Sequence, residues 1–157
     1  MIHTPADIIR ELLIDKECGS SPDDMNNHPW PIFVAREPST PDQNITVYNT
    51  QGVNHGRVQP TGEVIQHCGF QCLIRSFDTD IGYGKAEQIR VVLNEDVNRE
   101  LVLIHRLGQA DQEYIVQSCS QKSQINSLGK DRTNLDCYLF TLNYTTVISP
   151  IESGTGT

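Results

Sequence analysis

Residues 70–86 constrain the fold most, because an apolar strand runs directly into a helix that contains two glycines. The segment Gly-Tyr-Gly-Lys at 82–85 resembles a phosphate-binding loop. Such a loop requires a glycine five residues before Gly84 and a Ser or Thr after the lysine, but Thr79 and Ala86 stand there. Asp78 and Asp80 would also repel a phosphate. A dinucleotide-binding pattern fails as well, since no third glycine follows before residue 108. The sequence therefore argues against a nucleotide site.

The same segment predicts a helix that packs on a sheet. Its small and apolar residues recur at the spacing of one helical face, and we expect this face to make the helix–sheet contact: Gly82, Ala86, Ile89 and Leu93. Asp78, Thr79 or Asp80 can cap the helix by accepting hydrogen bonds from its free N–H groups. Lys85 is expected to point outward as a surface charge.

Length and charge limit the class of protein. A chain of 157 residues is expected to form one domain with a real core. The net charge of −8 argues against a nucleic-acid binder that tracks phosphates, since such proteins need a basic stripe. No stretch is long and apolar enough for a membrane span, and the first residues lack the features of a secretory signal.

The cysteines and histidines do not predict a reactive site. The five cysteines show no Cys-x-x-Cys spacing, and no two of the five histidines have the spacing of a metal site. His67 and Cys68 are adjacent in a predicted strand, so their side chains should point to opposite faces. We expect reduced cysteines that serve as small core residues in a cytosolic setting, with no catalytic residue, metal or cofactor.

The predicted element order is helix, three strands, helix, three strands. The first helix should begin at Thr4 and Pro5 and end between 15 and 18, with Gly19 after it. Strands are expected at 30–35, 45–48, 63–77, 100–106, 113–118 and 135–148, with a polar segment at 120–134. This order indicates an α+β domain over residues 1–148, in which helices pack on one face of a mainly antiparallel sheet. Residues 149–157 are expected to form a flexible tail.

Two features suggest contacts with other chains. Residues 49–61 form the longest irregular stretch, either an extended hairpin arm or a mobile loop, and long loops in compact domains usually have a role. Our candidate subunit or tube interface lies there: Gly52, Val53, Asn54, His55, Gly56, Arg57 and Val58. The strands also carry more apolar and aromatic residues than one buried face needs: Tyr48, Leu73, Phe77, Tyr138, Phe140 and Tyr144. This pattern predicts either a subunit interface or a second layer within the chain.

Several short motifs, taken in order, resemble a known family. They are Trp-Pro-Ile-Phe-Val at 30–34 with Glu-Pro at 37–38, Ile-Thr-Val-Tyr at 45–48, Thr-Gly-Glu at 61–63, residues 67–76 with 82–86, Leu-Gly-Lys-Asp at 128–131, and Phe-Thr-Leu-Asn at 140–143. Over roughly residues 4–148 the chain resembles the small tailed-bacteriophage proteins often labelled minor capsid proteins. These are similar in plan to the tail terminators of long-tailed phages.

The resemblance implies a structural virion protein of the tail or neck, assembled in the cytoplasm of the host bacterium. It implies a hexameric ring that caps the tail tube, ends tail polymerisation and joins the head connector. An inner sheet would line this ring, helices would lie outside, and DNA would pass through the lumen without specific binding. A negative lumen would help DNA to slide. Neither catalysis nor a membrane is implied.

Three alternatives remain open at this stage. A head-completion or neck adaptor protein would also form a ring, but it would bind the connector instead of the tube. A small hydrolase could use Cys68 or a histidine. A small binding module would stay monomeric.

Overall fold

A seven-stranded mixed sheet dominates the computed structural model, which describes residues 2–22, 30–38, 41–58, 63–131 and 136–151, with only the backbone for 53–58 and 63–66. The strands are β1 (Ile32–Val34), β2 (Asn44–Val58), β3 (Glu63–Ser76), β4 (Glu100–Ile104), β5 (Gln112–Gln121), β6 (Asn126–Lys130) and β7 (Tyr138–Ile151). Their order is β1-β2-β3-β7-β5-β4, and β6 also pairs with β7. All pairs are antiparallel except β1 with β2. The predicted α+β class with a mainly antiparallel sheet is confirmed.

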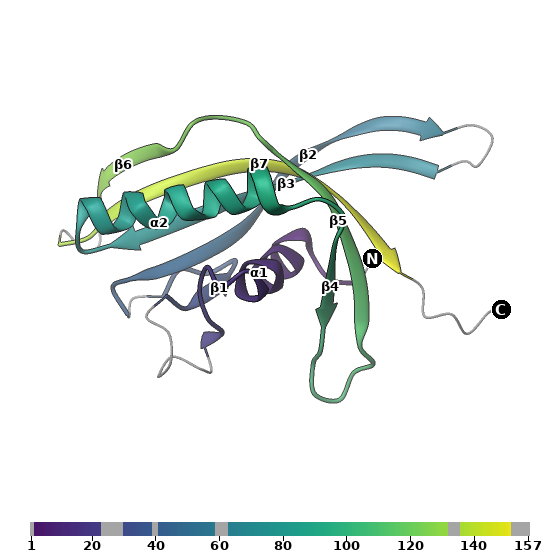
Figure 1. The fold of residues 1–157 in the computed structure, drawn as a ribbon, viewed down its shortest axis with the longest axis horizontal. Coiled ribbons are helices and arrows are strands. Elements are labelled where there is room, and N and C mark those ends of the chain that lie inside the picture. Colours follow the sequence, from purple (N-terminus) through teal and green to yellow (C-terminus); the bar gives the residue numbers. More distant parts are fainter. Residues whose placement is uncertain (1, 23–29, 39–40, 59–62, 132–135, 152–157) are drawn as a thin grey trace.

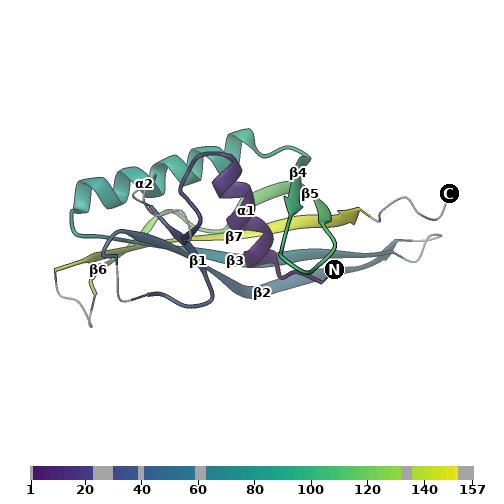
Figure 2. The same cartoon turned by 90° about the horizontal axis from the view of Figure 1, so that it is seen from below.

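Both helices, α1 (Pro5–Asp15) and α2 (Thr79–Val91), lie on one face of the sheet (Figures 1 and 2). Thr4 and Asp7 form a capping box at the start of α1, as the sequence indicates. The helix ends at Asp15, within the predicted range of 15–18, and the left-handed residue that follows it is Glu17, with φ of 60°. Gly19 is needed for space instead, since a Cβ there would lie 2.5 Å from the carbonyl oxygen of Trp30.

The sheet curls around α1. This helix contacts β2 near one end of the strand order and β4 at the other end, which a flat sheet would hold far apart. Its buried residues are Ala6, Ile8, Ile9, Leu12 and Leu13. They join one continuous core with the inward residues of the strands.

The glycine-containing helix α2 packs closely on β3 and β7. Gly82, Ala86, Ile89 and Leu93 are all buried, the last in a short π-helical segment, Val92–Asp96, that continues α2. A Cβ on Gly82 would lie 2.8 Å from the ring of Phe140. Nothing in the structure explains Gly84, around which there is open space.

The expectation that Lys85 points outward is wrong. Its Nζ donates to the backbone oxygen of Cys18 at 2.9 Å and lies 5.3 Å from the ring centre of Trp30. Desolvation by burial lowers the pKa of this ammonium group. The aliphatic stem of a lysine can cover apolar surface while its charge finds a carbonyl oxygen, and sequence spacing does not reveal such a partner.

Two boundaries also differ from the sequence prediction. The polar segment at 120–134 contains a strand, β6, which pairs with β7 around Gly129 in a left-handed conformation. Strand β7 continues to Ile151, so Ser149–Ile151 are sheet and not tail. The rest of the predicted tail, and the end of the 120–134 segment, lie outside the described residues.

A buried arginine fixes the connection between β1 and β2. Arg75 on β3 is 3 % exposed and points away from the helices. It donates to the backbone oxygens of Pro41 and Asp42 and lies 3.0 Å from a carboxylate oxygen of Glu37. The connection thus covers one end of the sheet face that the helices leave uncovered.

The two glycines of α2 should respond oppositely to alanine. Gly84→Ala should stabilise the fold by about 0.5–1 kcal/mol, because it raises helix propensity in open space. Gly82→Ala should destabilise it by about 1–3 kcal/mol, since the new methyl group meets Phe140. Urea unfolding of both variants measures this difference. Equal effects of the two substitutions would contradict the close helix–sheet approach.

Candidate assembly interface

The irregular stretch at 49–61 belongs largely to a hairpin arm formed by β2 and β3. Strand β3 pairs with β7 only from Cys68 to Ser76, and its residues 63–67 pair only with β2. The two strands therefore leave the sheet together and project beyond it (Figure 1). All seven residues of the candidate interface, 52–58, lie on the β2 side of this region. The first of the two alternatives, an extended hairpin arm, is the one observed, and 59–62 lie outside the described residues.

Two glycines shape the base of the arm. The pairing register shifts between Thr50 and Val53, where β2 has one more residue than β3. A Cβ on Gly52 would lie 2.1 Å from the backbone oxygen of His67, and a Cβ on Gly69 would lie 2.5 Å from the hydroxyl of Thr50. The extra residue of this bulge is in β2, opposite Gly69 and Cys68 of β3. A side chain at either position would force the strands apart.

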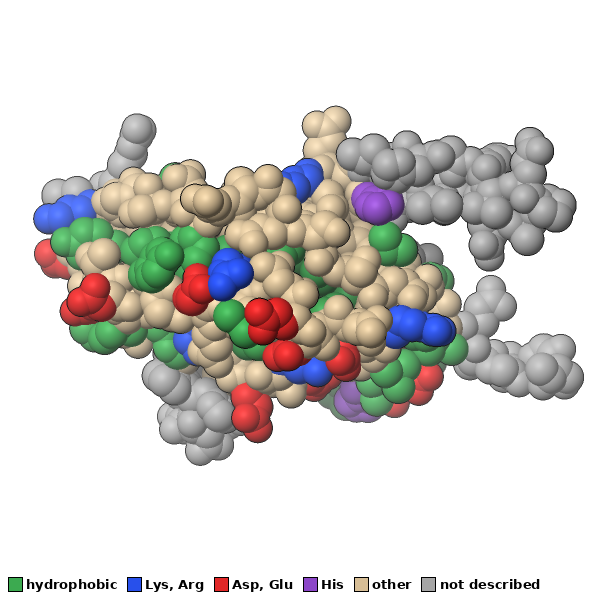
Figure 3. Space-filling model, turned by 45° about the horizontal axis from the view of Figure 1, so that its top comes forward, with side chains coloured by type: hydrophobic (Ala, Val, Ile, Leu, Met, Phe, Trp, Pro, Cys, Tyr) green, Lys and Arg blue, Asp and Glu red, His purple; other side chains and the backbone are tan. Residues whose placement is uncertain are grey.

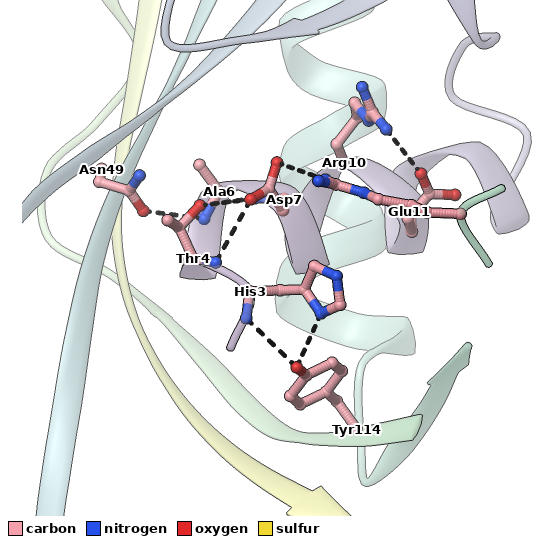
Figure 4. Close-up of polar contacts among 9 residues, drawn as sticks. His3, Thr4, Ala6, Asp7, Arg10, Glu11, Asn49 and Tyr114 are labelled. Atoms are coloured by element: carbon pink, nitrogen blue, oxygen red, sulfur yellow. Dashed lines mark hydrogen bonds and ion pairs between the residues drawn. The ribbon is translucent and has the colours of Figure 1, made fainter. Parts of the chain in front are cut away.

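The N-terminal residues tie the base of the arm to the opposite end of the sheet (Figure 4). The backbone N–H of His3 donates to the hydroxyl of Tyr114 on β5 at 3.3 Å, and Nδ1 of the same histidine lies 2.8 Å from that hydroxyl. Three residues later, the backbone N–H of Ala6 donates to Oδ1 of Asn49 on β2 at 2.9 Å. One turn of chain thus joins β2 and β5, which two other strands separate in the sheet.

An ion pair adds the β4–β5 turn to this arrangement. Arg106 lies 3.2 Å from a carboxylate oxygen of Asp7, the residue that completes the capping box of α1. We call these contacts of residues 3–7 with Asn49, Arg106 and Tyr114 the N-terminal clamp. None of its partners stood out in the sequence, because each contact joins residues far apart along the chain.

The sheet face opposite the helices contains a shallow hollow. Its volume is about 390 Å³, and none of its eight lining residues carries a charge. They are Tyr48, Gln71, Leu73, Asn126, Leu128, Leu139, Thr141 and Asn143. Leu73 and Tyr48 thus lie on this face, whereas Phe140 and Tyr144 belong to the core. The sheet therefore has apolar residues on both faces, and the described residues Glu37, Pro41 and Asp42 of the β1–β2 connection lie at the end near Arg75.

The cysteines have the properties of core residues. Burial raises the pKa of Cys18 and Cys119 to about 11 and raises that of Cys72 further. Burial also raises the pKa of Cys68, the thiol considered for a hydrolase, whereas a nucleophile needs a lowered one. No group of three or more metal-ligating side chains occurs in the described part of the chain.

The buried thiols should resist alkylation and make the fold sensitive to alkali. With a pKa near 11, only about one thiol in a thousand is ionised at pH 8. Iodoacetamide should therefore modify Cys18, Cys72 and Cys119 in urea but not in the native protein, as read by peptide mass spectrometry. The unfolded thiols ionise near pH 9 and the folded ones later, so stability should fall as pH rises from about 9 to 11. Rapid native labelling of Cys72 would contradict this burial.

Loss of the clamp hydroxyl should destabilise the fold. Tyr114→Phe removes the oxygen that contacts the backbone nitrogen and Nδ1 of His3, and we expect a cost of about 1–3 kcal/mol in urea unfolding. The amide hydrogen of His3 should also exchange faster. Tyr83→Phe is the control, since that ring is half exposed. Equal behaviour of the two variants would mean that the clamp contributes nothing.

Comparison with known proteins bears directly on this geometry. No helix in the described ranges is long and apolar enough to cross a membrane. A search of curated proteins found no match. A family described as "Bacteriophage tail terminator protein" matches residues 12–150, which covers all of α2, the last turn of α1 and the sheet except for Ile151 at its end. The chain therefore belongs to the bacteriophage tail terminator family, whose role is structural and associated with the phage tail.

Proposed function

We propose that this chain caps the phage tail tube as a ring, ends its polymerisation and forms the surface that meets the head connector. Membership of the terminator family supports the tail-associated part of this role. The hairpin arm supports the finer part, because its two strands pair with each other beyond the residues that β1 and β7 cover. A hexamer is the expected form of the ring.

The arm is suited to join other chains through its backbone. Strand β1 covers the outer edge of β2 only at Ile45–Val47, and β7 covers β3 only from Cys68 onward. Beyond these points, the strand pairing of the described residues leaves both outer edges of the arm open. Open strand edges present N–H and C=O groups that a neighbouring strand can pair with. We therefore assign the contact with the neighbouring subunit or the tube protein to the arm, including residues 52–58.

The face opposite the helices is the one we assign to the lumen. Its hollow is lined only by uncharged side chains, among them the hydrogen-bonded pair Gln71 and Asn143. DNA would then pass this region because basic groups do not line it, and not because carboxylates repel the phosphates. The role needs no catalytic group, in keeping with the raised pKa of Cys68.

Removing the arm should abolish head–tail joining while leaving the domain folded. The variant replaces residues 53–66 by Asn-Gly, which suits a two-residue hairpin turn, so that neither strand keeps an unpaired half. The melting temperature should change little, because none of the residues of the buried core lies in the deleted segment, and the core on β3 begins at Phe70. The measurement is complementation of a phage that lacks this protein, followed by electron microscopy of the products.

The defect that electron microscopy shows in the phage particles distinguishes termination from head completion. Overlong tails would support termination, whereas tails of normal length beside unjoined heads would indicate a head-completion protein instead. The control replaces residues 107–110, the tip of the β4–β5 turn, by Asn-Gly, which shortens a different hairpin. Full joining by the arm-less variant would show that the arm is not the interface.

A further inference from the structure

Strand β4 is an edge strand with apolar residues on both faces. It ends the strand order, and only its β5 side is paired within the described chain. Val102 and Ile104 are buried in the core, while Leu101 and Leu103 on the other face are 57 % and 47 % exposed. Soluble edge strands are usually protected by charges, prolines or a covering segment. The exposed face of β4 has none of these among its own residues, which indicates that another surface covers it.

The residue that leads into β4 supports an electrostatic role for this face. Arg99 has a φ of 55°, a backbone conformation that glycine or asparagine adopts with less strain. Its side chain is exposed and has no ion-pair partner among the described residues. A strained position that carries a free guanidinium is better explained by the use of its charge than by the fold.

A second exposed apolar surface lies where β3 passes into α2. Phe77 is 55 % exposed and Ile81 is 44 % exposed. We call residues 77–81 the Phe77 corner. Two carboxylates lie in it, that of Asp78, which caps α2, and that of Asp80, which has no ion-pair partner among the described residues. Figure 3 shows hydrophobic side chains gathered near this end of the molecule and, separately, near the β4–β5 turn.

These two surfaces complement each other in charge as well as in apolar character. A closed ring needs a head-to-tail contact between two different surfaces of the same chain. The β4 face offers leucines beside Arg99, and the Phe77 corner offers apolar side chains beside Asp80, and neither charge has an ion-pair partner in the described ranges. Glu100, the residue after Arg99, is ion-paired with Lys16 at 3.0 Å, and Glu113, opposite Leu103 on β5, lies at the end of β4 away from Arg99.

We propose that Leu101 and Leu103 of one copy pack against Phe77 and Ile81 of the next copy, with Arg99 facing Asp80. This contact rests on the proposed ring and specifies which surfaces of the chain close it. It is separate from the hairpin arm, which leaves the opposite side of the sheet.

Complementary single-face variants test the contact. Leu103→Asp places a negative charge on the β4 face, and Ile81→Asp places a charge of the same sign in the corner, at a helix position that favours an acidic residue. Each variant alone should self-associate roughly 30-fold more weakly than the wild type, as expected for loss of a buried apolar anchor. A mixture of the two should form one-to-one dimers and nothing larger, because each chain keeps one intact surface. Analytical ultracentrifugation measures both results, and Leu107→Asp in the exposed β4–β5 turn and Gln88→Asp on α2 are the matched controls.

The charge pair has its own test. Arg99→Gly should raise the stability of the isolated chain, because it relieves the left-handed backbone, and yet weaken association. Arg99→Asp should weaken self-association further, and adding Asp80→Arg to the same chain should restore self-association. If Arg99 had only a structural role, its replacement would instead lower the stability and the self-association together, or leave both unchanged.

Several outcomes would overturn the contact. They are a wild-type chain that stays monomeric at every concentration, single variants that associate like the wild type, and a mixture that forms no dimers. None of these decides the tail-capping role, which the tail-length assay measures independently. If both variants assemble normally, the proposed function still stands and only this interface is wrong.

Discussion

The N-terminal clamp is the constraint on which the shape of this protein depends. A seven-stranded sheet twists, but twist alone does not bring β2 near β5. The hydrogen bonds of residues 3–6 to Asn49 and Tyr114 do this directly, and α1 then fills the space that the curled sheet encloses. Because the clamp uses backbone N–H groups at the start of a helix, it also satisfies donors that would otherwise lack partners. The arm leaves the sheet at the point where the clamp holds β2.

The chain separates the parts that maintain its fold from the parts available for assembly. Core residues lie between the helices and the inward face of the sheet, and they end near Phe70 on the strand that continues into the arm. The hollow, the arm and the outward face of β4 all lie outside this core. An assembly protein needs such a division, since its surfaces must be free to bind while the core stays closed.

The sequence predicted what depends on local periodicity and failed where partners are distant. The face of Gly82, Ala86, Ile89 and Leu93 followed from helical spacing, and the cap at Thr4 from residue type. Strand β6 was missed, because Asn-Ser-Leu-Gly-Lys lacks alternation and pairs only through β7. The contact of Lys85 with Cys18 and the whole clamp depend on the tertiary fold, which no local pattern encodes. Of the candidate interface, the sequence located the arm but not the β4 face, whose exposure depends on which strand ends the sheet.

The glycines at the base of the arm allow the angle of the arm to be set independently of its length. Gly52 and Gly69 fix the angle at which the arm departs, because neither position has room for a side chain. The reach of the arm depends on the residues beyond Gly52 in β2 and beyond Cys68 in β3, which pair with each other and not with β7. A change in length at the tip therefore leaves the angle intact. Such a chain can lengthen or shorten the arm by adding or losing residue pairs, without readjusting the domain that aims it.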